Sequence, residues 1–387
     1  MIATFRAAAI GAAMLTATAA LHAQPVDLNT IPPYKKEITV VGGLRLAGSE
    51  LKGIVDKLVV GFMKFHPDAR VSTNFMTSSE GALGMMYAGV SDIAPMGDDA
   101  KISDQMPFFN AKGYVPTEIS VATGGYDLRG VLFPWAIFVH KDNPLTKLSV
   151  EQLDGIFGAE RSGGWEVGAN ADNNLLFTAK YARGPEKNIR TWGQLGLTGE
   201  WANQAIKTHG YVAPGFAVSF QRMVMHWSDK WNPNFMEYVE VKEATRDTAG
   251  HSVWSQRMYE TVSKDKYAIG WGGLMHIKGT CVNPDGSKCP GYPDLKVLAV
   301  SRTPDGPAIA LTADNVKNHS YPLTRDAYIY LDKAPGRALD PKVREFMRFV
   351  LSREGQQIIA DNGPYSPLTA DYLKEQGAKL EPSAATH

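Results

Sequence analysis

Residues 38–75 read ITVVGGLRLAGSELKGIVDKLVVGFMKFHPDARVSTNF and alternate between strand-like and helix-like patterns. The apolar run 38–41 predicts a strand, and a Gly-Ser turn follows it. Between residues 51 and 62 apolar residues recur at three- and four-residue spacing until Pro67 ends the pattern, which predicts an amphipathic helix. Residues 71–75 predict a second strand. This alternation is typical of an α/β sheet with helices on its faces.

The same alternation continues along the chain. Ser149 is a candidate N-cap for a helix at 148–158. We expect further elements at 77–89 (loop and helix), 92–96 (strand), 131–140 (buried apolar run), 267–274 (strand), 321–332 (extended) and 341–363 (one amphipathic helix).

Length and charge restrict the class of protein. The 387 residues predict about two domains, and 40 Lys+Arg balance 40 Asp+Glu, so the formal net charge is zero. Nucleic acid is therefore an unlikely partner class, because phosphate neutralisation requires clustered cations. Seven of the eight Trp residues lie between residues 165 and 271, which predicts a separate core for this middle part.

The first 23 residues predict a secretory signal peptide, because Arg6 precedes an apolar run that ends in small residues. We expect cleavage after Ala23 and a soluble protein exported to a bacterial periplasm. In that oxidising compartment Cys281 and Cys289, eight residues apart in a turn-rich segment, predict a disulfide, with two free thiols as the alternative. We expect no metal, because zinc needs two or more additional ligands close by.

The common catalytic motifs are absent. The sequence contains no G-x-S-x-G elbow, no phosphate-binding P-loop, no G-x-G-x-x-G and no H-E-x-x-H. We therefore expect no catalytic residues and no cofactor. What stands out instead are Ser/Gly loops before helices, at residues 47–49 and 77–81, because a helix N-terminus offers unpaired N–H groups to an anion. Taken alone, a serine at such a place is more often an N-cap.

Taken in order, the segments 47–67, 78–97, 143–165, 267–273 and 320–368 resemble the phosphate-binding family of periplasmic solute-binding proteins, the receptors of phosphate ABC transporters. The resemblance implies a type II fold of two α/β lobes, joined by two crossover strands and closing over a ligand cleft. It places the first lobe at 38–135 with 325–387 and the second at 136–324. It also implies a monomer that delivers its anion to ABC transporter membrane subunits.

The resemblance implies a ligand site made of loop residues from both lobes. Its candidate members are Gly48, Ser49, Glu50, Ser78, Ser79, Glu80, Gly81, Gly97, Asp98, Arg183, Gly215 and Ser219.

Several of these positions depart from the family pattern. Glu80 stands where Thr is frequent, and Gly97-Asp98 replaces a Ser-Arg pair. Residues 214–216, Pro-Gly-Phe, replace a Ser-Gly-Thr helix start, and its arginine is not evident, with Arg183 and Arg222 as the candidates. Asp98 or its neighbour Asp99 could accept a hydrogen bond from monohydrogen phosphate and so discriminate against sulfate. An exposed position in the first helical turn is the alternative for Glu80.

Phosphate is the ligand that the resemblance favours. Three alternatives remain open at this stage: the same fold with another small ligand, an exported phosphatase or hydrolase on this scaffold, and an interaction protein without small-molecule binding.

Overall fold

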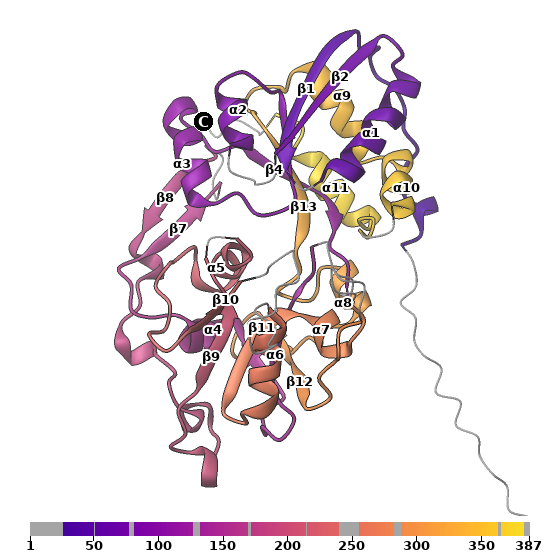
Figure 1. The fold of residues 1–387 in the computed structure, drawn as a ribbon. Helices are drawn as coiled ribbons and strands as arrows, with labels where there is room; N and C mark the ends of the chain where they lie inside the picture. The colour runs from indigo at the N-terminus through magenta and orange to yellow at the C-terminus, as the bar shows by residue number, and fades with distance from the viewer. Residues whose placement is uncertain are drawn as a thin grey trace, which may run out of the picture.

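The computed structural model describes residues 26–49, 51–76, 81–126, 132–168, 172–213, 215–239, 255–281, 288–362 and 365–382. This part of the chain forms two α/β lobes, each built around its own sheet, and β13 (Asp326–Leu331) leads from one lobe to the other (Figure 1). The expected two-lobed α/β architecture is confirmed.

The first sheet has five strands in the order β2-β1-β3-β13-β4. Strand β1 is parallel to β2 and β3, whereas β13 runs antiparallel to both β3 and β4. The last strand therefore returns from the far end of the chain into the middle of the N-terminal sheet. Besides β13, its strands are β1 (Gly42–Ser49), β2 (Ala69–Met76), β3 (Ile93–Met96) and β4 (Thr117–Thr123).

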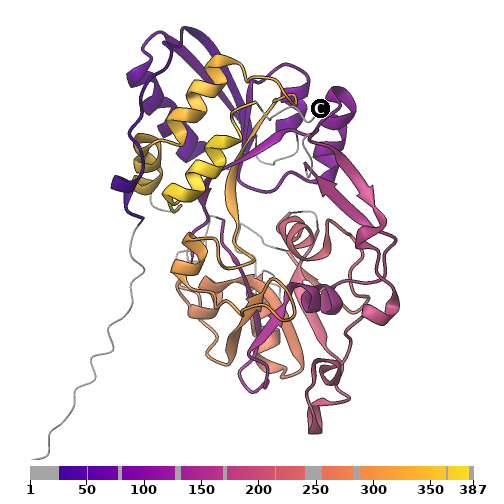
Figure 2. The ribbon, with the colours of Figure 1, turned by 180° about the vertical axis from the view of Figure 1, so that it is seen from behind.

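Helices from both ends of the chain cover this sheet. Helix α1 buries Ile54, Val55, Leu58 and Phe62 along one stripe and packs against the C-terminal helices α9 and α10. Burying each such side chain contributes about 1.5–3 kcal/mol. Figure 2 shows α9 and α11 lying together on the first lobe. The helices are α1 (Lys52–Phe65), α2 (Ala82–Tyr87), α3 (Ile102–Lys112), α9 (Pro341–Val350), α10 (Arg353–Asp361) and α11 (Ala370–Ala378).

The second sheet has six strands in the order β10-β9-β11-β5-β12-β6. Its core contains three of the tryptophans of the middle region, Trp192, Trp201 and Trp271. The strands are β5 (Trp135–His140), β6 (Lys147–Ser149), β9 (Lys207–Tyr211), β10 (Met236–Tyr238), β11 (Ala268–Gly273) and β12 (Leu295–Ser301). The helices are α4 (Val150–Phe157), α5 (Ala217–Met225), α6 (Ser255–Lys264), α7 (Leu274–Lys278) and α8 (Ala313–Lys317).

Shorter elements complete the fold. Strands β7 (Gly164–Val167) and β8 (Leu175–Thr178) form a hairpin outside the two sheets. Short 3-10 helices occupy Leu28–Thr30, Ala179–Tyr181, Pro185–Lys187, Trp192–Leu195 and Gly199–Trp201. No helix in the described ranges combines the length and the apolar character needed to cross a membrane.

The chain passes between the sheets twice, after β4 and before β13. One sheet thus takes its strands from 42–123 and 326–331, and the other from 135–301. The lobe boundaries 38–135 with 325–387, and 136–324, stay a proposal that follows this division.

Two sequence expectations were wrong about the elements. The run 38–41 is not a strand, because the first strand begins at Gly42, and the backbone N–H of Val40 instead donates to Nδ1 of His66 at 3.1 Å. The closing helix is two helices, because Ser352 caps a new one and accepts a hydrogen bond from the N–H of Gly355. The helix at 148–158 and its cap are confirmed, since the Ser149 hydroxyl accepts from the N–H of Gln152.

Candidate functional site

Three strand ends of the first sheet meet at one edge. Ser49 at the end of β1 lies opposite Met96 of β3, and Met96 lies opposite Tyr328 of β13. Since β13 runs antiparallel to β3, the residues just past Met96 face those just before Tyr328. The register therefore brings Ser49, Asp98 and Arg325 to the same edge.

Gly48 and Ser49 form the β1 side of this edge. A Cβ on Gly48 would lie 2.1 Å from the carbonyl oxygen of Pro95, so only glycine lets β1 approach β3 this closely. The Ser49 side chain is fully buried, and its hydroxyl has no hydrogen-bond partner among the described residues. A buried hydroxyl without a partner is costly and marks a place where a polar group can bind.

Arg325 forms the β13 side. Its residue is 1% exposed, and its Nη2 donates to Oδ1 of Asp98 at 2.7 Å. Its Nε and Nη1 are buried and find no acceptor in the described part of the chain. A buried guanidinium with two unused donors is well suited to a planar or tetrahedral oxyanion.

The second lobe surrounds the same guanidinium with aromatic rings. The Cζ of Arg325 lies 4.6 Å from the ring centre of Trp135 and 5.5 Å from that of Phe216. The ring centre of Phe133, in the chain segment between β4 and β5, is 6.0 Å from the same Cζ. These cation–π contacts fix Arg325 without using its N–H groups.

Gly215 and Ser219 lie at the start of α5, next to these rings. Gly215 has φ of +119°, a conformation that favours glycine. The Ser219 hydroxyl donates to the carbonyl of Phe216 at 3.1 Å and accepts from Nε1 of Trp135 at 2.9 Å. Ser219 thus positions Trp135 against Arg325.

Arg222 of α5 crosses from the second lobe to two carboxylates of the first. It contacts Asp99 through Nη1, and it binds Glu118 of β4 at 2.9 Å through Nη1 and at 2.7 Å through Nη2. The Tyr330 hydroxyl donates to Glu118 at 2.8 Å. Arg222, which sequence reasoning considered as the missing arginine, is therefore committed to a contact between the lobes.

Burial and charge shift the ionisation of this cluster. Burial raises the pKa of Asp99 to about 6, although the charge of Arg222 opposes the rise. Burial also opposes the ionisation of Glu118, but the charge and hydrogen bonds of Arg222 outweigh it, so the pKa of Glu118 is lowered. Asp99 is thus the member that titrates nearest neutrality.

The remaining expected site residues have different places. Gly97 is buried beside Asp98, and Gly81 caps α2 with φ of +98°. Arg183 is not part of this edge, because its donors go to Ala159 O at 2.7 Å and Asn188 Oδ1 at 2.6 Å within the second lobe. Glu50, Ser78, Ser79 and Glu80 lie outside the described residues.

Sequence reasoning missed Arg325 and Glu118. Arg325 directly precedes the predominantly apolar strand DAYIYL, and a cation at a buried strand start is the signal that could have found it. Glu118 has no comparable signal, because a Glu at the start of a strand is common on exposed edges.

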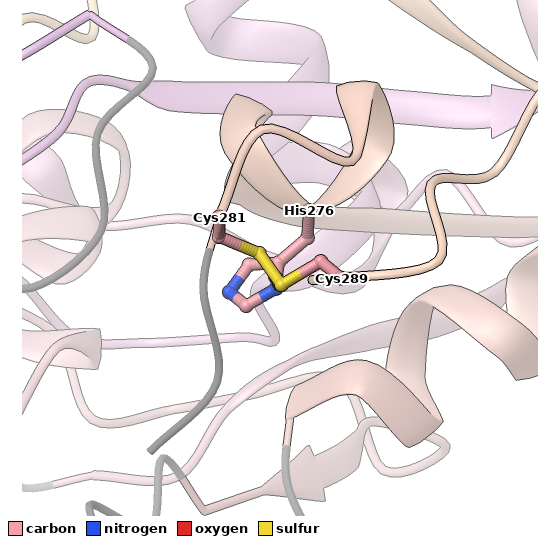
Figure 3. A group of neighbouring side chains, drawn as sticks. All are labelled: His276, Cys281 and Cys289. Atoms are coloured by element: carbon pink, nitrogen blue, oxygen red, sulfur yellow. Dashed lines mark hydrogen bonds between the residues drawn. A yellow bond between two sulfur atoms is a disulfide. The ribbon is translucent and has the colours of Figure 1, made fainter. Parts of the chain in front are cut away.

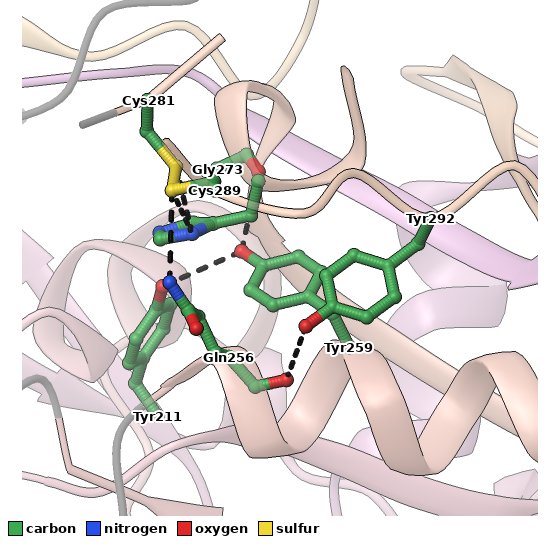
Figure 4. The surroundings of a disulfide bond; sticks show 8 residues. Tyr211, Gln256, Tyr259, Gly273, Cys281, Cys289 and Tyr292 are labelled. Carbon is green, nitrogen blue, oxygen red and sulfur yellow. Dashed lines mark hydrogen bonds between the residues drawn. A yellow bond between two sulfur atoms is a disulfide. The ribbon is translucent and has the colours of Figure 1, made fainter. Parts of the chain in front are cut away.

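The expected disulfide between Cys281 and Cys289 is confirmed, with a Cα–Cα distance of 5.3 Å. His276 of α7 lies beside it, with Nδ1 3.3 Å from Sγ of Cys281 (Figure 3). A hydrogen-bonded group of Gln256, Tyr259 and neighbouring residues surrounds the bridge (Figure 4). Although the three side chains have metal-ligand chemistry, disulfide sulfurs are not the thiolates that zinc requires.

Comparisons with known proteins identify the family of this chain. A family model described as a PBP superfamily domain matches residues 35–354. The phosphate-binding protein PstS of Pseudomonas aeruginosa, from two strains, is 28% identical over 368 residues, which cover 95% of this chain and 93% of that protein. A crystal structure of PstS from Borrelia burgdorferi matches with a TM-score of 0.50 at 14% identity, and covers 85% of this chain and 99% of that chain. The predicted family resemblance is confirmed.

Proposed function

The chain belongs to the PBP superfamily, and on that premise we propose that it is a solute receptor that binds phosphate or a closely related oxyanion between its lobes. Phosphate comes first because the curated relatives that match nearly the whole chain are named for binding it. We infer a binding role without catalysis.

One observation of the site carries the proposal. Arg325 is a buried cation with two unused N–H groups, at the strand edge where the Ser49 hydroxyl is also buried and unpaired. Leaving such groups without partners costs about 1–3 kcal/mol each. An oxyanion held by Arg325 and Ser49 would satisfy them together.

The same geometry suggests how phosphate would be held. Arg325 supplies charge-assisted hydrogen bonds, and Ser49 adds a hydroxyl donor directly before α1, a 14-residue helix. Asp98 is paired with Arg325, so its carboxylate can lie beside a dianion without net repulsion. A carboxylate there would accept a hydrogen bond from the hydroxyl of HPO₄²⁻, which sulfate lacks.

The wider role is proposed on the same basis. Residues 1–23 would act as a signal peptide, and the mature chain would work in the periplasm as a monomer. Its partners would be the membrane subunits of an ABC transporter, which receive the anion when the lobes open.

Isothermal titration with ligand-stripped mature protein tests the proposal. We expect one phosphate to bind per chain. Arg325→Gln should weaken binding at least about 100-fold, because two charge-assisted hydrogen bonds at about 1.5–3 kcal/mol each are lost. Ser49→Ala, a smaller change, should weaken it by about 5- to 10-fold.

The exposed Arg337 offers a matched control, since its side chain has no part in this edge. Arg337→Gln should bind phosphate like the unmodified protein. Absence of phosphate binding at millimolar concentration, or full affinity in folded Arg325→Gln and Ser49→Ala, would overturn the proposal.

A further inference from the structure

A second pocket lies between the lobes, apart from the strand edge of Arg325. Its volume is about 390 Å³, within the range of small-molecule sites. The first lobe contributes Thr117, Lys333 and Lys379 to its lining, and the second contributes Asn173 and Trp227. Ser49, Asp98, Arg325 and Ser219 are not among its lining residues.

Two ammonium groups of this pocket lack carboxylate partners. Lys333 is 8% exposed, and its ammonium has no ion pair or hydrogen bond with any residue that the structure describes. Lys379, which is exposed, donates within the described ranges to two neutral acceptors, the Glu118 carbonyl at 3.1 Å and Oε1 of Gln376 at 2.9 Å. Arg222 also lines the pocket, but Asp99 and Glu118 neutralise it. The lining therefore carries an excess of positive charge.

Burial of an unpaired cation is unfavourable unless something compensates it. Burial lowers the pKa of Lys333, and the charge of Glu381 offsets only part of this effect. An anion bound in the pocket would reverse this effect at Lys333 and would also face the exposed Lys379 ammonium.

The second-lobe residues that line the pocket have an unusual backbone conformation. Trp227 has φ of +66° and follows His226 at +53°, and neither is glycine. Asn173, at φ +54°, donates through Nδ2 to the Val115 carbonyl at 3.0 Å and so ties the β7–β8 hairpin to the first lobe. Residues in this region of φ cost about 1–3 kcal/mol each and concentrate at functional sites.

The lining also indicates what kind of anion fits. Beside the lysines stand Val115, Pro116, Val167 and Pro335, together with the Trp227 indole. Inorganic phosphate would leave these apolar groups facing water, whereas a carbon frame would cover them.

We propose that this pocket is a second ligand site, for a small organic acid whose carboxylates pair with Lys333 and Lys379 and whose carbon frame lies against Trp227. The ligand would touch both lobes and so favour their closed arrangement, which couples it to the first site. The proposal does not depend on which anion occupies the site at Arg325.

Titration with succinate, malate and citrate, at constant ionic strength and with saturating phosphate present, tests the inference. We expect at least one of these acids to bind with a Kd below about 1 mM, and glucose not to bind. Lys333→Met should weaken that binding at least about tenfold, because a charge-assisted hydrogen bond is lost, while leaving phosphate affinity unchanged. Lys379→Gln, as a second variant, should act in the same direction.

Lys374, exposed on helix α11 five residues before its C-cap Lys379, is the matched control, and Lys374→Met should bind the acid normally. Ser49→Ala should weaken phosphate binding and leave the acid bound. The inference is wrong if none of the three acids binds the phosphate-loaded protein, or if folded Lys333→Met and Lys379→Gln bind them as the unmodified chain does. A second inorganic phosphate lost only in Lys333→Met would also overturn it, because the occupant would then not be an organic acid.

Discussion

Arg325 and Asp98 show how single residues acquire function through distant pairing. Asp98 follows a strand of the N-terminal sheet, and the family resemblance proposes it as a ligand residue. Arg325 lies 227 residues further along and reaches Asp98 only because β13 inserts antiparallel beside β3. Local periodicity carries no information about that pairing, which is why sequence reasoning named Asp98 as a candidate and missed the arginine that pairs with it.

Asp98 should control the choice between phosphate and sulfate. In Asp98→Asn the side chain can donate a hydrogen bond to a fully deprotonated anion, and it no longer repels it. We expect the ratio of phosphate to sulfate affinity to fall at least about tenfold, which corresponds to about 1.4 kcal/mol. Titration of both anions measures this ratio, and an unchanged ratio in a folded variant would show that Asp98 does not face the ligand.

Asp99 should make stability depend on pH. Its pKa is about 6 in the folded protein against an ordinary value of 3.8, so between these values the folded state binds more protons than the unfolded state. The contribution of Asp99 to the free energy of unfolding therefore falls as pH rises from about 4 to about 6 and is constant above. Asn does not titrate, so the free energy of unfolding of Asp99→Asn, compared with that of the unmodified protein, should increase as pH rises across that interval.

Urea unfolding at pH 4.5 and pH 7.5 measures this difference. Asp92→Asn is the control, because hydrogen bonds from Arg45 outweigh burial and lower the pKa of Asp92. The stability that ionised Asp92 provides is present above pH 3.8 and lost only at lower pH, so its variant should show little change between the two conditions. Equal pH dependence for both variants would contradict the prediction.

Elements with a complete local signal were predictable, and those fixed by contacts elsewhere were not. Helix α4 carries its apolar stripe and its Ser149 cap within a few residues, so its start was predicted correctly. The strand expected at 38–41 failed because the strand position depends on pairing with β2, and that pairing begins at Gly42 opposite Ala69, after the apolar run. Helices α9 and α10 are separate because Ser352 caps α10. The sequence interpretation missed this cap because the apolar residues keep their helical spacing from one helix into the next.

Gly48 should be essential for the packing of β1 against β3. Gly48→Ala would place a methyl group 2.1 Å from the Pro95 carbonyl oxygen, so one strand must shift. We expect a loss of about 2 kcal/mol or more in the free energy of unfolding, together with weaker phosphate binding, because Ser49 moves with the strand.

Gly53 provides the matched control within α1. A Cβ there meets no atom within 4 Å, and alanine favours a helix by about 0.5–1 kcal/mol over glycine. Gly53→Ala should therefore stabilise the protein in the same chemical unfolding experiment. A Gly48→Ala variant as stable as the unmodified chain would show that β1 and β3 can separate without cost.

At the scale of the whole molecule, the two lobes are joined by ion pairs as well as by the two connecting segments of the chain. The connections fix which lobe each strand joins, and this division could be anticipated from the family resemblance. The ion pairs from Arg222 to Asp99 and Glu118 could not, because they join three segments that sequence order keeps apart. They are also the contacts that must rearrange if the lobes open.

Arg222 should hold the lobes together in the ligand-free protein. Arg222→Gln removes the cation and leaves Asp99 and Glu118 to repel each other within the first lobe. We expect a larger radius of gyration in small-angle scattering and phosphate affinity weakened by about 3- to 30-fold, because the closed arrangement becomes less populated. Arg45→Gln, which removes an exposed ion pair with Asp92 inside one lobe, should change neither quantity. If Arg222→Gln also leaves both unchanged, the lobes are held by their chain connections and ligand alone.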